Sequence, residues 1–172
     1  MTILPIVKHI NDVLRTICAP VATVDDAVRK LMDDMLDTMY DAPGIGLAAC
    51  QVGITQRIVV LDCIRDAEED EKQPMFFINP EITWVSEEQA EYEEGCLSIP
   101  GIYENVTRPA ECKVTFLDYN GQAQEMHCTE LLATCIQHEV DHLNGVLFID
   151  HISRLKRGIA MKKYKKLKSE TM

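Results

Sequence analysis

Two histidines that could bind one metal ion lie four residues apart in the segment His138-Glu139-Val140-Asp141-His142. On a helix, residues four apart share a face, so both imidazoles can direct a ring nitrogen at the same ion. Glu139 would then lie beside the ion without binding it, where a carboxylate can accept a proton from a metal-bound water. The pattern is typical of metal-dependent hydrolases, and we predict such a centre between His138 and His142.

A third protein ligand is needed, because catalytic zinc sites typically have three ligands and one open position. Metzincin peptidases extend the motif with a third histidine, but Phe148 occupies that position in this sequence. Cys135 precedes His142 by seven residues, about 10.5 Å along a helix, which is too far for a short side chain. We therefore expect Cys135 in the pocket wall or the core.

Three other residues remain candidates for the third ligand. His127 lies in an alternating, strand-like stretch, and His151 follows the motif. Cys96 is modestly favoured, because it lies in a predicted turn and Gly95 beside it permits close backbone approach. The residues by themselves leave this choice open.

The elements that must position these residues follow from the hydrophobic pattern. The segment from Leu131 to about Leu143 has no Gly or Pro and is rich in helix formers, which places the metal motif on a helix. An amphipathic helix is predicted after Asp25 and Asp26, with its apolar face formed by residues 28, 31, 32, 35, 36 and 39. Pro43-Gly44 ends it.

Short β-prone runs predict buried strands at 58–61 and 76–78, with an acidic loop over 66–73 between them. Alternating residues over 112–116 and again up to Cys128 predict a β-hairpin that turns at Asn120-Gly121. This order of helix, strands, hairpin and helix is an α+β order.

Length and composition predict that residues 1–172 form one globular domain, which the family resemblance described below implies is the catalytic domain. Apolar residues make up 47% of the chain, which excludes a disordered protein. No apolar run approaches ~18 residues and no signal peptide is apparent, so we expect neither membrane insertion nor export. Seven scattered cysteines argue against a disulfide framework and for a reducing, cytoplasmic compartment.

The net charge of −11 is distributed unevenly. Residues 154–172 contain eight of the 17 lysines and arginines and one acid, Glu170, so this tail carries +7 and the remainder −18. The acidic body argues against a nucleic-acid-binding face on the domain itself, whereas the tail could contact an acidic partner. We expect a basic C-terminal helix at about 154–170.

Three segments together resemble the peptide deformylase family: Gly44-Ile45-Gly46-Leu47-Ala48-Ala49-Cys50-Gln51, Glu94-Gly95-Cys96-Leu97-Ser98 and Gln137-His138-Glu139-Val140-Asp141-His142. Their order and separation match that family, and the resemblance extends over nearly the whole chain. It implies antiparallel sheets packed around a central metal-binding helix, with a C-terminal helix. It also implies hydrolysis of the N-formyl group from formylmethionine at the start of nascent polypeptides, with release of formate.

The resemblance further implies one divalent metal ion per chain, Fe(II) physiologically and Zn(II) or Ni(II) as isolated, with Cys96 joining His138 and His142 as a ligand. It makes Glu139 the general acid–base group, and it makes the Gln51 amide and the Leu97 backbone N–H the donors to the developing oxyanion. The implied substrate contacts are Ile45, Gly46, Tyr92, Glu94, Leu131, Thr134 and Cys135, together with His138. Thr134 departs from the more apolar residues of that pocket wall.

Some of these residues also have ordinary structural interpretations. Without the resemblance, Gln51 is a surface amide, and Gly44 and Gly46 are turn residues that end the first helix. Arg108, just before Pro109, is a hypothetical partner of Glu94 that would orient the ligand set.

Two rival functions remain. A metallopeptidase would cut internal peptide bonds, but Phe148 weakens that reading. A metal-stabilised binding module would need four protein ligands and would leave Glu139 without a role. The partners that we expect for a deformylase are N-formylmethionyl peptides and, through the basic tail, the ribosome; we expect a monomer and no membrane.

Overall fold

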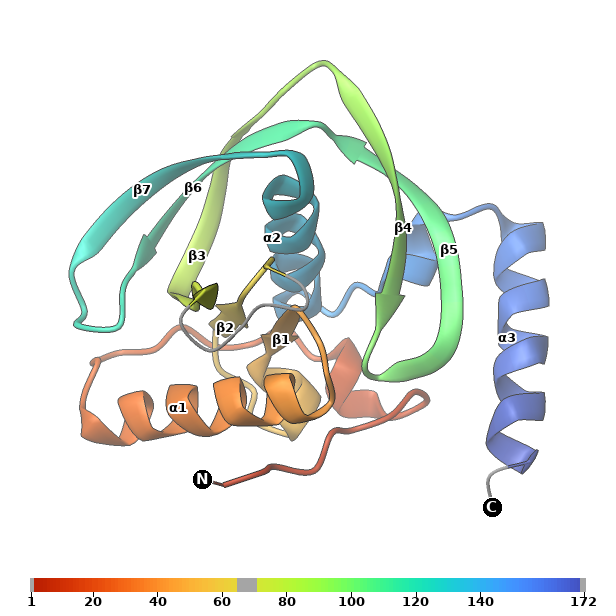
Figure 1. The fold of residues 1–172 in the computed structure, drawn as a ribbon, viewed down its shortest axis with the longest axis horizontal. Coiled ribbons are helices and arrows are strands. Elements are labelled where there is room, and N and C mark those ends of the chain that lie inside the picture. The colour runs from red at the N-terminus through yellow and green to blue at the C-terminus, as the bar shows by residue number, and fades with distance from the viewer. Residues whose placement is uncertain (1, 65–70, 171–172) are drawn as a thin grey trace.

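A central helix, α2, lies between two antiparallel sheets in the computed structural model, which describes residues 2–64 and 71–170 (Figure 1). One sheet has the order β1-β2-β3-β6-β7 and the other pairs β4 with β5. The bounds are β1 (Gly46–Ala48), β2 (Ile58–Leu61), β3 (Met75–Val85), β4 (Gln89–Cys96), β5 (Ile99–Pro109), β6 (Glu111–Leu117), β7 (Ala123–Thr129) and α2 (Glu130–Leu143). The predicted α+β class, with antiparallel sheets around a central helix, is confirmed.

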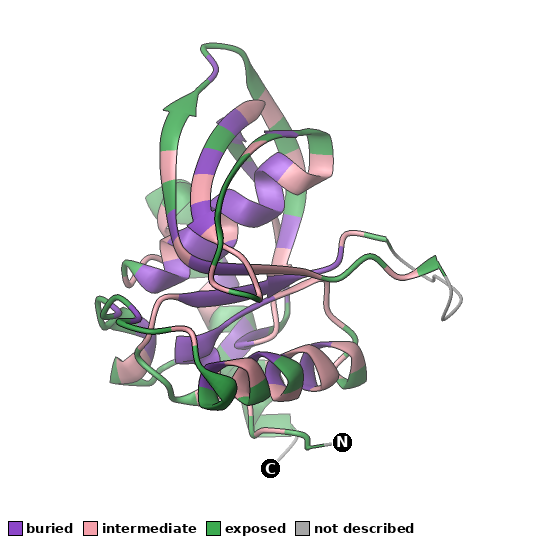
Figure 2. Ribbon diagram, turned by 90° about the vertical axis from the view of Figure 1, so that its left-hand side faces the viewer, coloured by how far each residue is buried: buried purple, intermediate pink, exposed green. Residues whose placement is uncertain are grey.

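Helix α2 is buried because both of its sides are covered. Ala133, Ile136, Val140 and Leu143 join one apolar cluster with the large sheet, including Val59 and Phe77. Figure 2 shows the resulting burial along the helix. Polar residues on α2 are consequently withdrawn from water as well, and that is the environment of the predicted metal motif.

Helix α1 (Asp26–Asp41) covers the other face of the large sheet. It begins where predicted, because the Asp25 side chain accepts a hydrogen bond from the backbone N–H of Val28 at 3.0 Å. Its buried residues Met32, Met35 and Met39 pack against residues of β2 and β3. The helix ends before Pro43-Gly44, as the sequence indicated.

The predicted strands are present, and the hairpin has the expected turn. Strand β2 has the predicted bounds, whereas β3 extends well beyond residues 76–78. Strands β6 and β7 pair from Glu111↔Thr129 to Leu117↔Ala123, and Gly121 in the turn has a φ of +80°, which glycine adopts readily. The predicted acidic loop over 66–73 lies mostly outside the described residues.

Strands β1, β4 and β5 were not predicted from the sequence. Gly46 is the first residue of β1, paired with Leu61, and is therefore not a turn residue, whereas Gly44 does follow the end of α1. Strand β4 carries several acidic side chains instead of a β-prone run, and Pro100-Gly101 interrupts the start of β5, so the pattern of this pair is weak. This hairpin is the element that brings Cys96 to α2.

Within the described ranges, the fold also contains the short helices η1 (Asp12–Arg15), η2 (Ala49–Val52) and η4 (Phe148–His151) and the C-terminal helix α3 (Arg154–Glu170). Helix α3 forms the predicted basic C-terminal helix and packs on β5, the strand at the outer edge of the small sheet (Figure 1). Ala160 and Tyr164 are its buried residues. Among the described residues, no helix combines the length and apolar character that crossing a membrane requires.

Candidate metal centre and active site

Three potential metal ligands converge at the end of β4 and on α2. One ligand atom each from Cys96, His138 and His142 lies within 4.8 Å of the other two. The Cys96 sulfur is 3.4 Å from Nε2 of His142. Ligands of one tetrahedral zinc ion at ordinary bond lengths would lie roughly 3.6 Å apart, so this separation fits a shared ion.

The surroundings of these atoms also fit a divalent cation. The side-chain amide of Gln51 donates a hydrogen bond to the Cys96 sulfur at 3.4 Å, so this sulfur faces a polar group instead of the apolar core. Burial alone lowers the pKa of His138, but hydrogen bonds to Cys96 and Glu94 outweigh it and raise the pKa to about 10. The same negative partners would stabilise a metal ion at this ring. Burial and repulsion from His138 hold the pKa of His142 well below its usual value, so that ring is neutral, as a ligand must be.

A buried ion pair holds the ring of His138 from behind. Nδ1 of His138 lies 2.9 Å from Oε1 of Glu94. Glu94 in turn accepts two hydrogen bonds from Arg108, at 2.7 and 2.9 Å, and both side chains are only 5% exposed. The hypothetical Arg108–Glu94 pair is thus present. Arg108 also donates to Asp141 at 2.8 Å, a contact that was not expected from the sequence.

Glu139 has the environment of a general base. Its side chain is almost fully buried, and Oε1 has no hydrogen-bond partner among the described residues. The same oxygen is 3.9 Å from Nε2 of His142. Burial raises the pKa of Glu139 to about 7, against a lowering contribution from His138. A carboxyl group with that pKa can both accept and release a proton near neutral pH.

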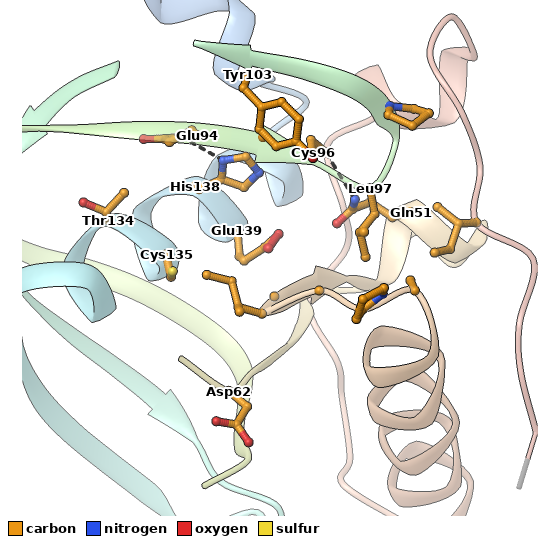
Figure 3. A pocket seen from close by; sticks show the side chains of 18 of the residues that line it. Gln51, Asp62, Glu94, Cys96, Leu97, Tyr103, Thr134, Cys135, His138 and Glu139 are labelled. Carbon is orange, nitrogen blue, oxygen red and sulfur yellow. Dashed lines mark hydrogen bonds and ion pairs between the residues drawn. The ribbon is translucent and has the colours of Figure 1, made fainter. Parts of the chain in front are cut away.

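Gln51 is a buried residue of η2, and its interpretation as a surface amide is wrong. It is 1% exposed, and its Oε1 accepts a hydrogen bond from the backbone N–H of Ala48 at 2.9 Å. Because the amide oxygen is held in this way, the amide nitrogen points the other way, toward Cys96 and toward Ser98 Oγ at 3.1 Å. The residue therefore presents a donor to the metal centre (Figure 3).

A cavity of about 750 Å³ opens beside these residues. Glu139, Gln51 and Leu97 face this cavity together with Cys96 and His138 (Figure 3). The predicted substrate contacts that line it are Ile45, Gly46, Glu94, Leu131, Thr134 and Cys135. Tyr92 is not among its lining residues; it precedes Glu94 by two positions on β4. Lining residues that were not expected from the sequence include Lys8, Tyr40, Asp62, Ile64, Lys72 and Tyr103.

The other candidate ligands lie elsewhere. His127, on β7, pairs with Glu111 at 2.8 Å near the surface, and His151 contacts Asp141 at 2.7 Å. Cys135 is in the cavity wall and in the core cluster, as expected. Phe148, at the metzincin ligand position, stacks on the His138 ring with centroids 6.0 Å apart.

Comparison with known proteins gives a consistent result. Residues 3–158 match the family model described as polypeptide deformylase. A peptide deformylase of Caulobacter sp. (strain K31) is 59% identical over 154 residues, which cover 90% of this chain and 88% of the relative. A peptide deformylase structure from Legionella pneumophila superimposes with a TM-score of 0.91 at 43% identity, covering 99% of this chain and 98% of that one. The Ehrlichia chaffeensis deformylase in complex with actinonin gives 0.89 at 42% identity and covers 96% and 98% of the two chains.

Proposed function

The chain belongs to the polypeptide deformylase family, whose members remove N-formyl groups from nascent peptides, and we propose that it does so at Cys96, His138 and His142. The observation that carries this assignment is the convergence of one thiol and two imidazoles beside the buried carboxyl group of Glu139. The family's substrate is a polypeptide that begins with formylmethionine, and the products are formate and a free amino terminus.

Cys96, His138 and His142 would hold one divalent ion per chain. A thiolate and two imidazoles suit both Fe(II) and Zn(II), and we propose Fe(II) as the physiological ion, with Zn(II) or Ni(II) as replacements. Such an ion, when bound, acts as a Lewis acid that lowers the pKa of water and polarises the formyl carbonyl. A structural zinc site is a poorer interpretation, because a fourth protein ligand is expected there and the amide of Gln51 is poorly suited to that role.

Glu139 is the residue that moves the proton. Its Oε1 has no protein donor among the described residues, so it is available to a water molecule in the cavity. In the mechanism that we propose, this oxygen accepts the proton of the attacking water and later delivers it to the leaving amine. The pKa of about 7 suits both steps near neutral pH.

Gln51 and Leu97 stabilise the charge that develops on the formyl oxygen. The amide nitrogen of Gln51 is already directed at Cys96, and Leu97, the next residue after the ligand, lines the same cavity. Donors fixed before the reaction need no reorganisation during it, and losing one typically costs ~2.7 to 4 kcal/mol of transition-state stabilisation.

The methionine side chain would lie against the apolar part of the cavity. Ile45, Leu131 and Cys135 provide apolar contacts there, and Thr134 adds a hydroxyl group to the same wall. Gly46 leaves room for the substrate backbone to approach β1 in an extended form. Tyr92 is left out of this pocket, because it does not line the cavity.

Helix α3 is the proposed contact with the ribosome. We propose that the protein acts in the cytoplasm and as a monomer. Lys162, Lys163 and Lys166 are exposed on α3, whereas Ala160 and Tyr164 hold the helix to the body. Changing these three lysines to Glu should weaken salt-sensitive ribosome binding without altering hydrolysis of a short formyl peptide. Unchanged binding would contradict this role for α3.

The decisive experiment compares formyl-Met and acetyl-Met peptides. A deformylase requires the formyl group, whereas a metallopeptidase would cut internal bonds of both peptides. Glu139→Gln should retain the metal and lose nearly all deformylation, and Cys96→Ala should lose the metal. Normal metal content and activity in Cys96→Ala would show that the ligand assignment is wrong.

A further inference from the structure

The short helix η4 (Phe148–His151) contacts the proposed ligand His138 by two separate routes. Phe148, at its start, stacks on the imidazole with an interplanar angle of 23°. His151, at its end, reaches the same imidazole indirectly, through charged residues. Phe148 packs on the face of the ring and forms no hydrogen bond with it. The hydrogen bonding of the ring therefore depends on the charged residues of the second route.

The second route is a continuous series of short polar contacts. His151 Nε2 is 2.7 Å from Oδ2 of Asp141, and the same Oδ2 is 2.8 Å from Arg108. Arg108 then bonds to both oxygens of Glu94, and Oε1 of Glu94 meets Nδ1 of His138 at 2.9 Å. Five side chains from α2, β4, β5 and η4 are thus joined.

Burial differs along this series, and the difference shows that the contact between His151 and Asp141 is the one most open to water. Arg108 and Glu94 are each 5% exposed, whereas Asp141 is 25% and His151 35% exposed. Oδ2 of Asp141 is held by both His151 and Arg108, and part of this side chain is open to water. The orientation of Asp141 therefore depends on these two partners.

The orientation of Asp141 affects His138 because Arg108 is shared between two carboxylates. If Asp141 turned toward water, the guanidinium group of Arg108 would pair with Glu94 alone. Glu94 would then be a weaker acceptor for the N–H of His138, and a weaker acceptor makes the other ring nitrogen a weaker metal ligand. His142 cannot compensate, because its Nδ1 has no hydrogen-bond partner among the described residues.

We propose that His151 is a positioning residue for His138, acting through Asp141, Arg108 and Glu94 on the strength with which the centre holds its metal. His151 is fixed for this task by η4, whose Asp150 bonds to Arg15 at 2.6 Å and caps the backbone N–H of Leu147. This inference rests on the proposed function, because it assumes that His138 binds the ion.

The test measures how fast Zn(II) leaves the fully loaded protein in the presence of excess chelator. His151→Leu removes the contact, and His151→Gln retains a donor N–H. The matched controls are His127→Leu and His127→Gln, because His127 is also a partly exposed histidine paired with a carboxylate, on β7. Loss of an outer partner of a ligand typically costs ~10–100-fold in metal affinity, and we expect about tenfold faster release for His151→Leu, at the low end, because His151 acts through three residues.

His151→Gln should release Zn(II) more slowly than His151→Leu, and both controls should match the unmodified protein. For His151→Leu, kcat should fall while KM for a formyl-Met peptide stays unchanged, since His151 does not line the cavity. In an Asp141→Ala background, the His151→Leu change should add little, because the link is already cut.

Release from His151→Leu at the rate of the unmodified protein, or equal rates for His151→Leu and His127→Leu, would overturn the inference. If the unmodified protein did not bind one Zn(II) ion per chain, the proposed function would be overturned instead. The two failures are therefore distinguishable.

Discussion

The carboxyl group of Glu139 lies directly against the α-carbon of Gly46. A Cβ atom at residue 46 would be 2.6 Å from Oε2 of Glu139 and 2.8 Å from Cδ2 of Leu61. Both are ends of side chains, so the protein can accommodate the atom only by moving one or both of them. A glycine is therefore required in β1 for the proposed general base to occupy its position.

Gly46→Ala should consequently displace the Glu139 carboxyl group while leaving the metal ligands in place. We expect kcat to fall by about 100-fold, the loss associated with ~1 Å misplacement of a catalytic group. Steady-state kinetics and metal analysis of the purified variant would measure this. Gly158→Ala is the control, because a Cβ there would have no described residue within 4 Å apart from the adjacent backbone of its own helix. Full activity in Gly46→Ala would contradict the role given to this contact.

Gln51→Leu should remove a donor to the reacting oxygen and keep the metal. The expected loss is about 10²- to 10³-fold in kcat, the usual effect of removing one oxyanion donor. Some stability is lost too, because the Ala48 N–H loses its acceptor. Thr38→Val provides the comparison: it removes the buried hydroxyl that accepts from the Leu4 N–H and lies on α1. If both variants keep kcat, Gln51 has only a structural role.

Arg108→Ala should destabilise the fold and weaken metal retention together. It leaves Glu94 and Asp141 without their shared cation, and removing one partner of a buried pair typically costs about 3–5 kcal/mol of unfolding free energy. Urea unfolding and metal content are the measurements. Arg108→Lys should restore little, because an ammonium group cannot bond to Glu94 in the same two-pronged geometry. Unchanged stability and metal content would remove this role for Arg108.

Asp150→Asn should lower stability at neutral pH but not in acid. Burial alone raises the pKa of Asp150, but bonds from Arg15 and the Leu147 N–H outweigh it and hold the pKa below its usual value. A carboxyl group whose pKa is lower in the folded than in the unfolded state stabilises the fold at pH values above its unfolded-state pKa. This stabilisation is lost as the pH falls through the folded-state pKa.

The pair with Arg15 is partly exposed, so the difference at pH 7 should not exceed about 1 kcal/mol. Unfolding titrations of both proteins from pH 7 down to acid would show the two stabilities converging below the usual Asp range. A difference that persists undiminished in acid would assign the effect to the lost helix cap instead of the charge.

Local sequence was sufficient to predict the half of the site that lies on one helix. The spacing of His138 and His142 and the absence of helix breakers determine that both rings share a face of α2, because contacts between residues four apart need only the helix itself. Local signals were also sufficient for two other elements. A capping residue indicated where α1 begins, and turn residues indicated the β6–β7 hairpin.

Tertiary structure decided the remainder. Cys96 joins the histidines because the small β4–β5 sheet packs beside α2, and the acidic pattern of β4 does not indicate a strand. Gln51 has the composition of a surface residue and becomes a buried donor only when η2 packs in the core. Similarly, Arg108 reaches Asp141 across elements far apart in the chain. Such contacts depend on how apolar faces pack over the whole domain, and residue spacing carries no information about that packing.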